Sequence, residues 1–550
     1  MIPGDELIFL PLGGSGEIGM NVNLYGCRGK WLMVDLGLTF GDPGLPGVDL
    51  VLPDLSFIEE RRKDLLGVVL THGHEDHIGA IPYLVEDLGD VPLFATPFTA
   101  SLIRAKLQEE GIADRVDLRV VDLGGTVDLG PFSCRYIPLA HSIPEGNALL
   151  IDTPFGRIFH TGDWKLDDEP VLGIPSTAQE LTAIGDQGVL AVVGDSTNVF
   201  NPETAGSESA VRADLDQIIT EAKGRVVVTT FASNAARLAT LGQVAIDTGR
   251  QLSIAGRSLE RITKTARSVG YLTDFPDVIS FDAVMDLPRK EAMIIATGGQ
   301  GEPMAALARI ASGNHPIKLT TGDLVIFSSK QIPGNEMAIG RIQNQLAEAG
   351  VEMVTDRQAM IHVSGHPGRP DLAAMFGWLR PRIVVPVHGE MRHMVEHARF
   401  ALAEGVPQSI VPKNGSVIRL APGNPEIISH EAAGRLVLDG DVILPSDGAT
   451  MVSRRRISVH GYMAVTIVLD REGALAADPA VLMQGVPVEE DREAFLDDVR
   501  GKLRDAADKE AGVPEARLRE ALRLAARRTA TAWTGKKPIV EVALVTLDAA

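Results

Sequence analysis

The stretch Thr71-His72-Gly73-His74-Glu75-Asp76-His77-Ile78-Gly79 places three histidines and an aspartate within six residues. It follows a short apolar run, 67–70, that is typical of a buried strand. Imidazole and carboxylate are the usual protein ligands of zinc. One helix face cannot gather all four side chains, because His74 and Asp76 are not helical neighbours. A loop can direct them inward, with Gly73 relieving the crowding. The stretch therefore predicts a metal-binding strand-to-helix turn. A polar surface loop is disfavoured, since three of the 13 histidines fall here.

The composition predicts a multidomain globular protein. A chain of 550 residues is too long for one hydrophobic core, so about three domains are expected. No apolar run reaches the ~18 residues of a membrane span, and no secretory signal is visible at the N-terminus. Cys27 and Cys134 are expected to be reduced core residues. These features favour a cytoplasmic protein without a membrane segment.

The net charge of −21 disfavours generic nucleic-acid binding by a basic surface. It does not exclude a nucleic-acid substrate. An enzyme needs only a local positive channel, with metal ions at the scissile phosphate.

Short strands at 7–10, 25–27 and 31–34 predict a β-meander that opens a sandwich of sheets. The glycine-rich loop 13–19 is weak as a dinucleotide motif, because no suitable helix follows it. Asp35 ends the third strand, and we expect it to orient the metal loop by hydrogen bonds. After the metal loop, the sequence predicts one helix over 79–88.

Three further candidate ligands stand at predicted strand ends: His141, Asp163 and His388. Each alone could be an ordinary polar residue, but their order after the first cluster favours ligands. Asp163 can bridge two metals because a carboxylate has two oxygens with lone pairs.

Between Asp163 and His388, apolar runs alternate with helical stretches. The predicted strands are 225–230, 252–255, 292–296 and 324–327, and the predicted helices are 235–245, 259–269, 304–311 and 336–349. This βαβα repetition predicts a parallel sheet with helices on its faces. Its predicted strand ends, 231–234, 297–303 and 328–330, are small, polar and glycine-rich, which suits a phosphate or a sugar.

The C-terminal part predicts a last sandwich strand at 436–444, a linker and a small α/β domain. This domain is expected to have strands at 464–469 and 539–547 and helices at 491–507 and 514–530. We expect this domain to serve in oligomerisation or RNA guidance. Trp533, Lys536 and Lys537 either contact RNA or form a plain turn, and the turn is favoured. The predicted boundaries are 1–200 and 366–450 for the two parts of the sandwich domain, 201–365 for the insert, 451–460 for the linker and 461–550 for the C-terminal domain.

The H-x-H-x-D-H motif resembles the second motif of the metallo-β-lactamase superfamily, and Asp35, His141 and Asp163 match its first, third and fourth motifs. A lactamase-type domain interrupted by a doubly wound insert resembles the β-CASP nucleases, and several segments resemble their bacterial ribonuclease J branch. These segments include 12–19, 160–163, 194–198, 231–234, 299–304, 332–336, 362–366 and 386–390. The resemblance implies an αββα sandwich interrupted by a β-CASP parallel α/β domain, plus a small α/β C-terminal domain.

The resemblance also implies roles for single residues. One metal would be held by His72, His74 and His141, and the other by Asp76, His77 and His388, with Asp163 as the bridge. Asp195 and His366 match residues assigned to proton transfer. The ligand set favours two zinc ions, although such sites also accept manganese. A pocket for a 5′-terminal phosphate would be formed by Ser233, Asn234, His362, Val363, Ser364, Gly365 and His366.

The family resemblance implies 5′-to-3′ exonuclease and endonuclease activity on single-stranded RNA, with preference for 5′-monophosphate ends and roles in RNA maturation and mRNA decay. It also implies a homodimer or homotetramer, contacts with other RNA-decay proteins, and a calcium-type site for which Asp49 and Asp441 are the candidates. One departure concerns Ala235 and Ala236, which stand where relatives have an apolar residue and a histidine. A nucleotide contact from position 236 is therefore in doubt.

Three alternative functions are disfavoured by the sequence. A DNA-repair nuclease of the same superfamily is disfavoured by the branch-specific segments at 299–304, 332–336 and 362–366. A non-catalytic RNA-binding subunit is disfavoured because all seven predicted ligands are present. A small-molecule hydrolase such as a lactonase is disfavoured by the long insert.

Overall fold

The computed structural model describes residues 4–42, 44–332 and 334–547. They divide into two units. One unit holds the residues up to Thr39 together with Leu52–Gly434, and the other holds Phe40–Val51 together with the residues from Arg435 onward. Within the described ranges, no helix has the length and apolar character needed to cross a bilayer.

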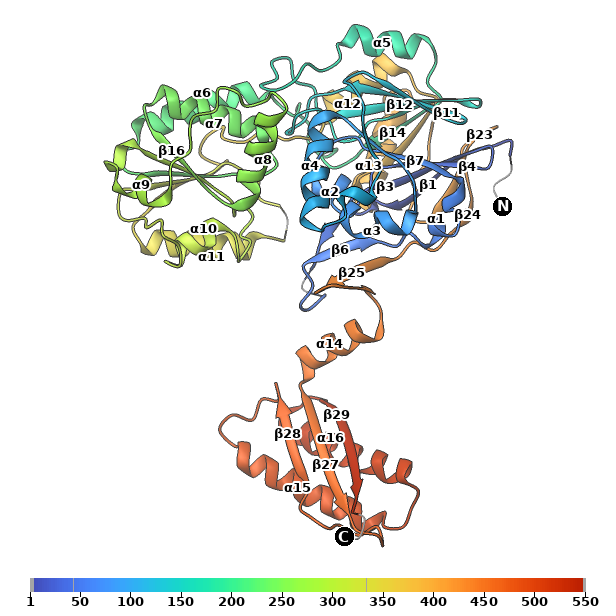
Figure 1. Cartoon of the computed structure of the whole chain (residues 1–550), viewed down its shortest axis with the longest axis vertical. Helices are drawn as coiled ribbons and strands as arrows, with labels where there is room; N and C mark the ends of the chain where they lie inside the picture. Colours follow the sequence, from blue (N-terminus) through green and yellow to red (C-terminus); the bar gives the residue numbers. More distant parts are fainter. Residues whose placement is uncertain (1–3, 43, 333, 548–550) are drawn as a thin grey trace. The chain divides into compact units, whose positions relative to one another are not determined.

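Two β-sheets packed face to face form the sandwich of the first unit (Figure 1). One sheet has the order β24-β23-β1-β3-β4-β7-β8-β9, and the other has the order β10-β11-β12-β13-β14-β20-β22. The strands of the first sheet are β1 (Leu7–Gly13), β3 (Val22–Cys27), β4 (Lys30–Val34), β7 (Leu65–Val69), β8 (Leu93–Ala95), β9 (Leu118–Val120), β23 (Ser416–Ala421) and β24 (Glu426–His430). Those of the second are β10 (Thr126–Leu129), β11 (Phe132–Pro138), β12 (Asn147–Thr153), β13 (Gly156–His160), β14 (Ala191–Asp195), β20 (Ile383–Val387) and β22 (Gln408–Ser409).

Apolar side chains from both sheets, among them Phe9, Tyr136 and Val385, form one buried core between them. Helices cover the outer faces: α4 (Pro97–Glu109) contacts β8 and β9. On the other side, α5 (Ala178–Asp186), α12 (Arg369–Leu379) and α13 (Met391–Ala403) contribute to a second apolar cluster with the strands. The predicted αββα sandwich is confirmed.

The inserted domain is a parallel five-stranded sheet of order β16-β17-β15-β18-β19 with helices around it (Figure 1). Its strands are β15 (Val226–Thr229), β16 (Gln251–Ala255), β17 (Ala292–Ala296), β18 (Leu324–Phe327) and β19 (Glu352–Val354). Its helices are α6 (Glu208–Glu221), α7 (Ala235–Asp247), α8 (Arg257–Ser268), α9 (Phe281–Asp286), α10 (Ala306–Ala311) and α11 (Glu336–Glu348). The chain leaves the sandwich after β14 and returns as β20, its parallel neighbour, so the predicted insertion is confirmed.

The single helix predicted at 79–88 is wrong. The segment contains α3 (Ile81–Leu84) and a 3-10 turn at Val85–Leu88, and α2 (Glu75–Ile78) precedes them. The helix breaks at Leu84, whose φ and ψ of −120° and −11° are not helical.

The strand predicted at 436–444 is also corrected. It is a hairpin of β25 (Arg435–Asp439) and β26 (Val442–Pro445), in a sheet with β5 (Thr39–Phe40) and β6 (Leu50–Pro53) rather than in the sandwich. Gly440, at a φ of 60°, makes the turn that divides the predicted strand. Residues 435–450, expected in the sandwich domain, therefore fall in the second unit. The predicted linker 451–460 lies within α14 (Ala449–His460).

The C-terminal domain is a three-stranded sheet of order β28-β27-β29 with two helices. Its elements are β27 (Tyr462–Leu469), β28 (Ala480–Gln484), α15 (Arg492–Lys509), α16 (Glu515–Thr534) and β29 (Ile539–Thr546), of which β28 was missed. Alternate residues of β27 enter a core with both helices. Trp533 donates to Asp498 of α15 and packs on Phe495.

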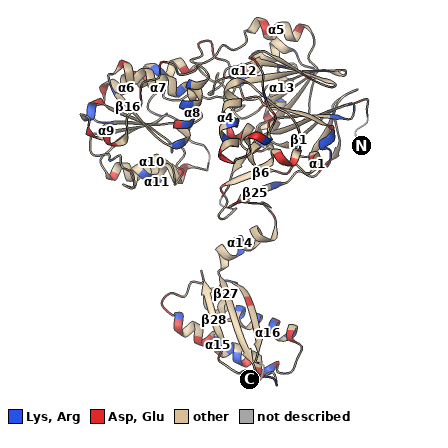
Figure 2. Ribbon diagram, in the orientation of Figure 1, with Lys and Arg blue, Asp and Glu red and all other residues tan. Residues whose placement is uncertain are grey.

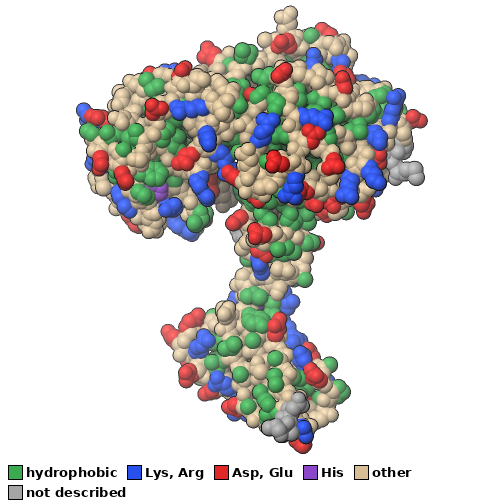
Figure 3. Space-filling view, in the orientation of Figure 1, with side chains coloured by type: hydrophobic (Ala, Val, Ile, Leu, Met, Phe, Trp, Pro, Cys, Tyr) green, Lys and Arg blue, Asp and Glu red, His purple; other side chains and the backbone are tan. Residues whose placement is uncertain are grey.

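On the face that Figure 3 presents, acidic and basic side chains are mixed. Basic residues gather on α8, which carries Arg257, Arg261, Lys264 and Arg267 (Figure 2). An acidic chain thus has at least one local positive surface, as a nucleic-acid substrate requires.

Candidate metal centre

The predicted ligands meet because several strands of the sandwich end at the same edge. β7 leads into the loop with His72, His74, Asp76 and His77. In the second sheet, β13, β14 and β20 are parallel neighbours, so their carboxyl ends bring Asp163, Asp195 and His388 together.

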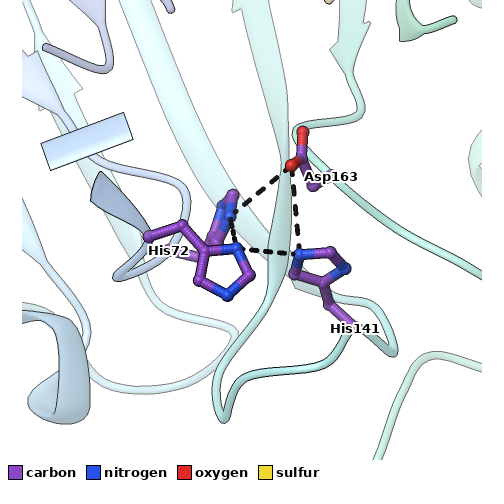
Figure 4. A group of neighbouring side chains, drawn as sticks. His72, His141 and Asp163 are labelled. Atoms are coloured by element: carbon purple, nitrogen blue, oxygen red, sulfur yellow. Dashed lines mark hydrogen bonds and ion pairs between the residues drawn. The ribbon is translucent and has the colours of Figure 1, made fainter. Parts of the chain in front are cut away.

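One ligand set comprises His72, His74, His141 and Asp163, whose ligand atoms all lie within 4.8 Å of one another (Figure 4). His74 Nδ1 lies 3.2 Å from His72 Nε2 and 3.1 Å from His141 Nε2. Asp163 Oδ2 lies 3.8 Å from His72 Nε2 and 3.9 Å from His141 Nε2. These spacings suit four ligands around one tetrahedral ion.

The second set comprises Asp76, His77, His388 and again Asp163. His388 Nε2 lies 3.1 Å from Asp76 Oδ2 and 3.5 Å from Asp163 Oδ2. His77 Nε2 lies 3.2 Å from Asp163 Oδ1. Both Asp163 oxygens therefore lie beside nitrogens of the second set, and Oδ2 also lies beside the first set, so one carboxylate contacts both sets, as a bridging ligand must.

In His141 and His77, the ring nitrogen Nδ1 faces away from the cluster, and its hydrogen bond fixes the direction in which Nε2 points. His141 Nδ1 donates to the carbonyl oxygen of Gly365 at 2.7 Å. His77 Nδ1 donates to Asp35 at 2.6 Å, and Asp35 also accepts from the amide and hydroxyl of Thr71. In the neutral form of either ring, a proton on Nδ1 leaves the Nε2 lone pair directed into the cluster. Burial would lower the pKa of His77, but Asp163, Asp76 and Asp35 outweigh it and raise that pKa well above its usual range, so a metal ion must displace the second proton of this ring. Asp35 thus lies where its predicted orienting role requires.

His388 is held in the same way. The Thr197 hydroxyl donates its proton to the His388 carbonyl oxygen. The His388 Nδ1, 3.2 Å from the same hydroxyl, therefore donates to the hydroxyl oxygen. With its proton on Nδ1, the ring presents the Nε2 lone pair to a metal. The His388 amide donates to Gly14 at 2.7 Å. The glycine-rich loop also pairs with the chain after His388, through β2 (Ser15–Gly16) and β21 (Gly389–Glu390). The loop therefore helps to place this ligand.

Burial favours neutral imidazoles in the first ligand set. It lowers the pKa of His74 to about 3 and of His141 to about 4, and it holds the pKa of His72 well below its usual range. Burial alone would raise the pKa of Asp163, but His388, His77 and His366 outweigh it and hold that pKa well below its ordinary value. Neutral nitrogens facing one another beside an ionised carboxylate fit a divalent cation.

Asp195 and His366 form a pair at the rim of the cluster. His366 Nδ1 donates to Asp195 Oδ2 at 2.7 Å, and Asp195 Oδ1 accepts from the amide of Thr197. Burial would lower the pKa of His366, but Asp195 and Asp163 outweigh it and raise it to about 9. His366 therefore favours its protonated form at neutral pH, and its side chain is about a quarter exposed.

The predicted phosphate-binding residues come from two segments. Ser364, Gly365 and His366 follow one another beside His141, and Ser364 Oγ accepts from the His366 amide. His362 Nδ1 is buried without a hydrogen-bond partner in the described part of the chain. Burial, together with the cations Arg237, Lys330 and Lys165, lowers its pKa to about 3. An anion would find a positive surrounding there.

Ser233 and Asn234 lie at the start of α7. The Asn234 side chain accepts from the amide of Arg237 as an N-cap, so its oxygen already has a partner. Val363 packs over Gly206. The Ala236 amide donates to the Ser142 carbonyl oxygen at 3.4 Å.

Two residues near the site were missed by sequence reasoning. Arg237 is fully buried; it pairs with Glu208 and donates to the carbonyl of Ile361 at 2.6 Å, which ties α7 to the segment before His362. Asn21 lies 3.1 Å from His77 Nε2 and donates to the Asp76 carbonyl. Asn21 follows the glycine-rich loop 13–19, and this position was the feature of the sequence that could have indicated a role near the metal ligands.

Asp49 and Asp441, the candidates for a calcium-type site, do not lie in a cluster of metal-ligand side chains among the described residues. Both residues are exposed, and neither belongs to the three groups of candidate ligands found among the described residues. Asp441 lies in the turn between β25 and β26, and Asp49 precedes β6 in the same sheet.

Four family models match the chain. They are the Beta-lactamase superfamily domain at residues 46–174, the Ribonuclease J, beta-CASP domain at 223–346, the Zn-dependent metallo-hydrolase RNA specificity domain at 350–411 and the Ribonuclease J C-terminal domain at 449–547. Their order agrees with a sandwich, an insert, a return to the sandwich and a C-terminal domain.

Curated relatives match over most of the chain. Ribonuclease J of Sinorhizobium meliloti is 42% identical, with 98% of each chain covered. Ribonuclease J of Mycobacterium tuberculosis is 38% identical, with 96% of this chain and 94% of the relative covered. A solved structure from Enterococcus faecalis, titled a protein of unknown function, has a TM-score of 0.53 at 17% identity, covers 75% of this chain and all of its own, and supports the fold alone.

Proposed function

The chain belongs to the ribonuclease J family and is a metal-dependent ribonuclease, and from this premise we propose that it hydrolyses single-stranded RNA with two metal ions, both from the 5′ end and internally. The observation that carries the proposal is the pair of ligand sets that share Asp163. One carboxylate serving two sets is the requirement of a two-metal centre, which acts on both the attacking and the leaving oxygen.

In this proposal His72, His74 and His141 hold one ion, Asp76, His77 and His388 hold the other, and Asp163 bridges them. When bound, the ions would lower the pKa of a water molecule, so that it could lose a proton and attack the phosphate. They would also offset the charge that develops on the phosphate. The nitrogen-rich set favours zinc, and the carboxylates also permit manganese. Asp35 and Thr197 accept from Nδ1 of His77 and His388, which directs Nε2 of each ring toward the cluster.

His366 is proposed as the general acid. Its contact with Asp195 keeps the ring protonated at neutral pH, so it can give a proton to the departing oxygen. Asp195 fixes the ring orientation, as a carboxylate does for a catalytic histidine.

The 5′-phosphate pocket is proposed at residues 362–366, with Ser233 and Asn234 as its further members. The unpartnered His362 nitrogen, the Ser364 hydroxyl and the nearby cations suit a phosphate. A monophosphate bound there, close to His141, would place the first phosphodiester bond at the metals. RNA that does not engage the pocket would be cut internally.

Other parts of the proposal follow from the family. We expect a homodimer or homotetramer through the C-terminal domain, contacts with other RNA-decay proteins, a cytoplasmic location, and roles in RNA maturation and mRNA decay. A calcium-type site at Asp49 and Asp441 is retained as a proposal that isothermal titration with calcium and an Asp441→Asn variant would test.

The deciding experiment digests one RNA that carries a 5′ monophosphate, triphosphate or hydroxyl, with zinc or manganese added and product sizes resolved. We expect single nucleotides from the monophosphate form and internal fragments from all three. His74→Ala is the inactive control, and a DNA of the same sequence runs beside it. Intact monophosphorylated RNA with either metal, or faster cleavage of DNA, would refute the proposal.

A further inference from the structure

One loop of the sandwich carries a metal ligand and also touches the inserted domain. This loop, residues 141–147 between β11 and β12, is called the register loop. His141 contacts the carbonyl of Gly365, and the Ser142 carbonyl accepts from Ala236 at the start of α7. A Cβ added to Gly365 would lie only 2.8 Å from His141 Cε1, so the two segments are in direct contact. The register loop therefore lies between the metal ligands and the phosphate pocket.

A third contact joins Glu145 of the register loop to Tyr271, which follows α8 in the insert. The Glu145 carboxylate accepts from the Phe98 amide at 2.8 Å, at the start of α4, and the Tyr271 hydroxyl lies close enough to this carboxylate for each group to change the pKa of the other. The Tyr271 ring meets Phe98 edge-on with ring centroids 6.2 Å apart. Glu145 is buried, so breaking this contact would leave a desolvated carboxylate with fewer donors.

The backbone of Glu145 indicates that this side chain is held in place. Its φ of 59° lies in the left-handed region, which is unfavourable for a residue with a Cβ. Such a conformation persists where its surroundings over-determine it. The Arg261–Glu109 ion pair also joins α8 to α4, but it is partly exposed and contributes little.

We propose that Tyr271 and Glu145 are positioning residues that fix the spacing between the metal centre and the 5′-phosphate pocket, and thereby favour cleavage from the 5′ end over internal cleavage. The inference rests on the proposed function. End-dependent cleavage needs the pocket and the metals to hold one RNA strand at the same time, and misplacement by about 1 Å can cost a large part of the rate. Internal cleavage uses the metals without the pocket.

The test is Tyr271→Phe, which removes the hydroxyl and keeps the ring on Phe98. The matched control is Tyr462→Phe in the C-terminal domain, which likewise removes a tyrosine hydroxyl beside a glutamate; the Tyr462 hydroxyl donates to Glu541 at 2.8 Å. Both variants are assayed as full-length, metal-loaded protein on 5′-monophosphate and 5′-hydroxyl RNA, with product sizes resolved and metal content measured. Glu145→Gln is a second variant whose amide oxygen can still accept from Tyr271.

We expect Tyr271→Phe to lose on the order of ten-fold in 5′-end-dependent cleavage, the scale of one hydrogen bond to a charged group. Internal cleavage and metal content should stay within about two-fold, Glu145→Gln should lose less, and Tyr462→Phe should match the unaltered chain. An unchanged ratio of the two cleavage modes in Tyr271→Phe, or an equal loss of both, would overturn the inference while the proposed function stands. Failure of the unaltered chain to cut RNA would overturn both.

Discussion

Asp35→Asn tests whether the hydrogen bonds behind the ligands control metal binding. Asp35 is fully buried and binds no metal in our proposal. It accepts from the Thr71 amide at 2.8 Å, the Thr71 hydroxyl at 2.8 Å and His77 Nδ1 at 2.6 Å. Asparagine has nearly the same shape but offers only one accepting oxygen.

The amide nitrogen of the substituted side chain would face either Thr71 or His77. If it faces His77, the ring must accept at Nδ1 and carry its proton on Nε2, where Asp163 lies 3.2 Å away. A protonated Nε2 cannot bind a metal. Loss of such an outer partner typically costs 10–100-fold in metal affinity, or about 1.4–2.8 kcal/mol. We therefore expect zinc to bind that much more weakly at the site of His77.

Zinc affinity is measured by titration against a competing chelator, with circular dichroism as a check of folding. Asp323→Asn is the matched control, because Asp323 is equally buried and accepts from the amides of Arg225 and Thr320 in the insert. It should lose stability without losing zinc affinity. Zinc affinity at the level of the unaltered chain in a folded Asp35→Asn variant would refute the reasoning, and so would an equal loss in the control.

Four further predictions can be tested. His74→Ala should abolish both cleavage modes and lower the metal content, measured by elemental analysis, whereas retained RNA cleavage would exclude His74 as a ligand. Ser364→Ala should weaken 5′ exonuclease activity more than internal cutting, and equal loss of both in the RNA digestion would contradict the pocket. Removal of metal by a chelator should lower the melting temperature, since ions that bind only the folded state stabilise it; an unchanged calorimetric transition would count against a folded-state metal site. Burial, partly opposed by Asp195, lowers the pKa of His397 to about 4. The neutral ring therefore contributes fully to the free energy of unfolding above about pH 6.5, and this contribution, about 3 kcal/mol, is lost as the pH falls toward 4. His397→Asn should flatten that fall in urea unfolding, and an identical pH profile would refute this.

The secondary structure of the insert could be predicted closely, because its apolar strand runs are short and bounded by turn residues. Strands predicted at 292–296 and 324–327 coincide with β17 and β18. Prediction failed where a turn divided an apolar stretch. At Gly440 one predicted strand became a hairpin, and at Leu84 one predicted helix was broken. Such breaks depend on single backbone conformations that hydrophobic patterns do not record.

The identity of the candidate ligands was available from the sequence because a ligand must be histidine, aspartate or a similar residue, and because each stands in a short motif at the end of an apolar strand. The structure brings all seven of them together, along with Asp195 and His366. It does not bring Asp49 or Asp441 into any such group of described residues.

The sequence by itself therefore determined which side chains can carry the chemistry, starting with the cluster from His72 to His77. Only the tertiary structure decided how they are oriented: which nitrogen of His388 is held by Thr197, 191 residues away, and which loop meets Tyr271 of the insert. The physical reason is that ligand chemistry resides in single residue types, whereas orientation depends on hydrogen bonds between groups far apart in the chain. Their pairing exists only once the sheets have packed and the insert lies against the register loop.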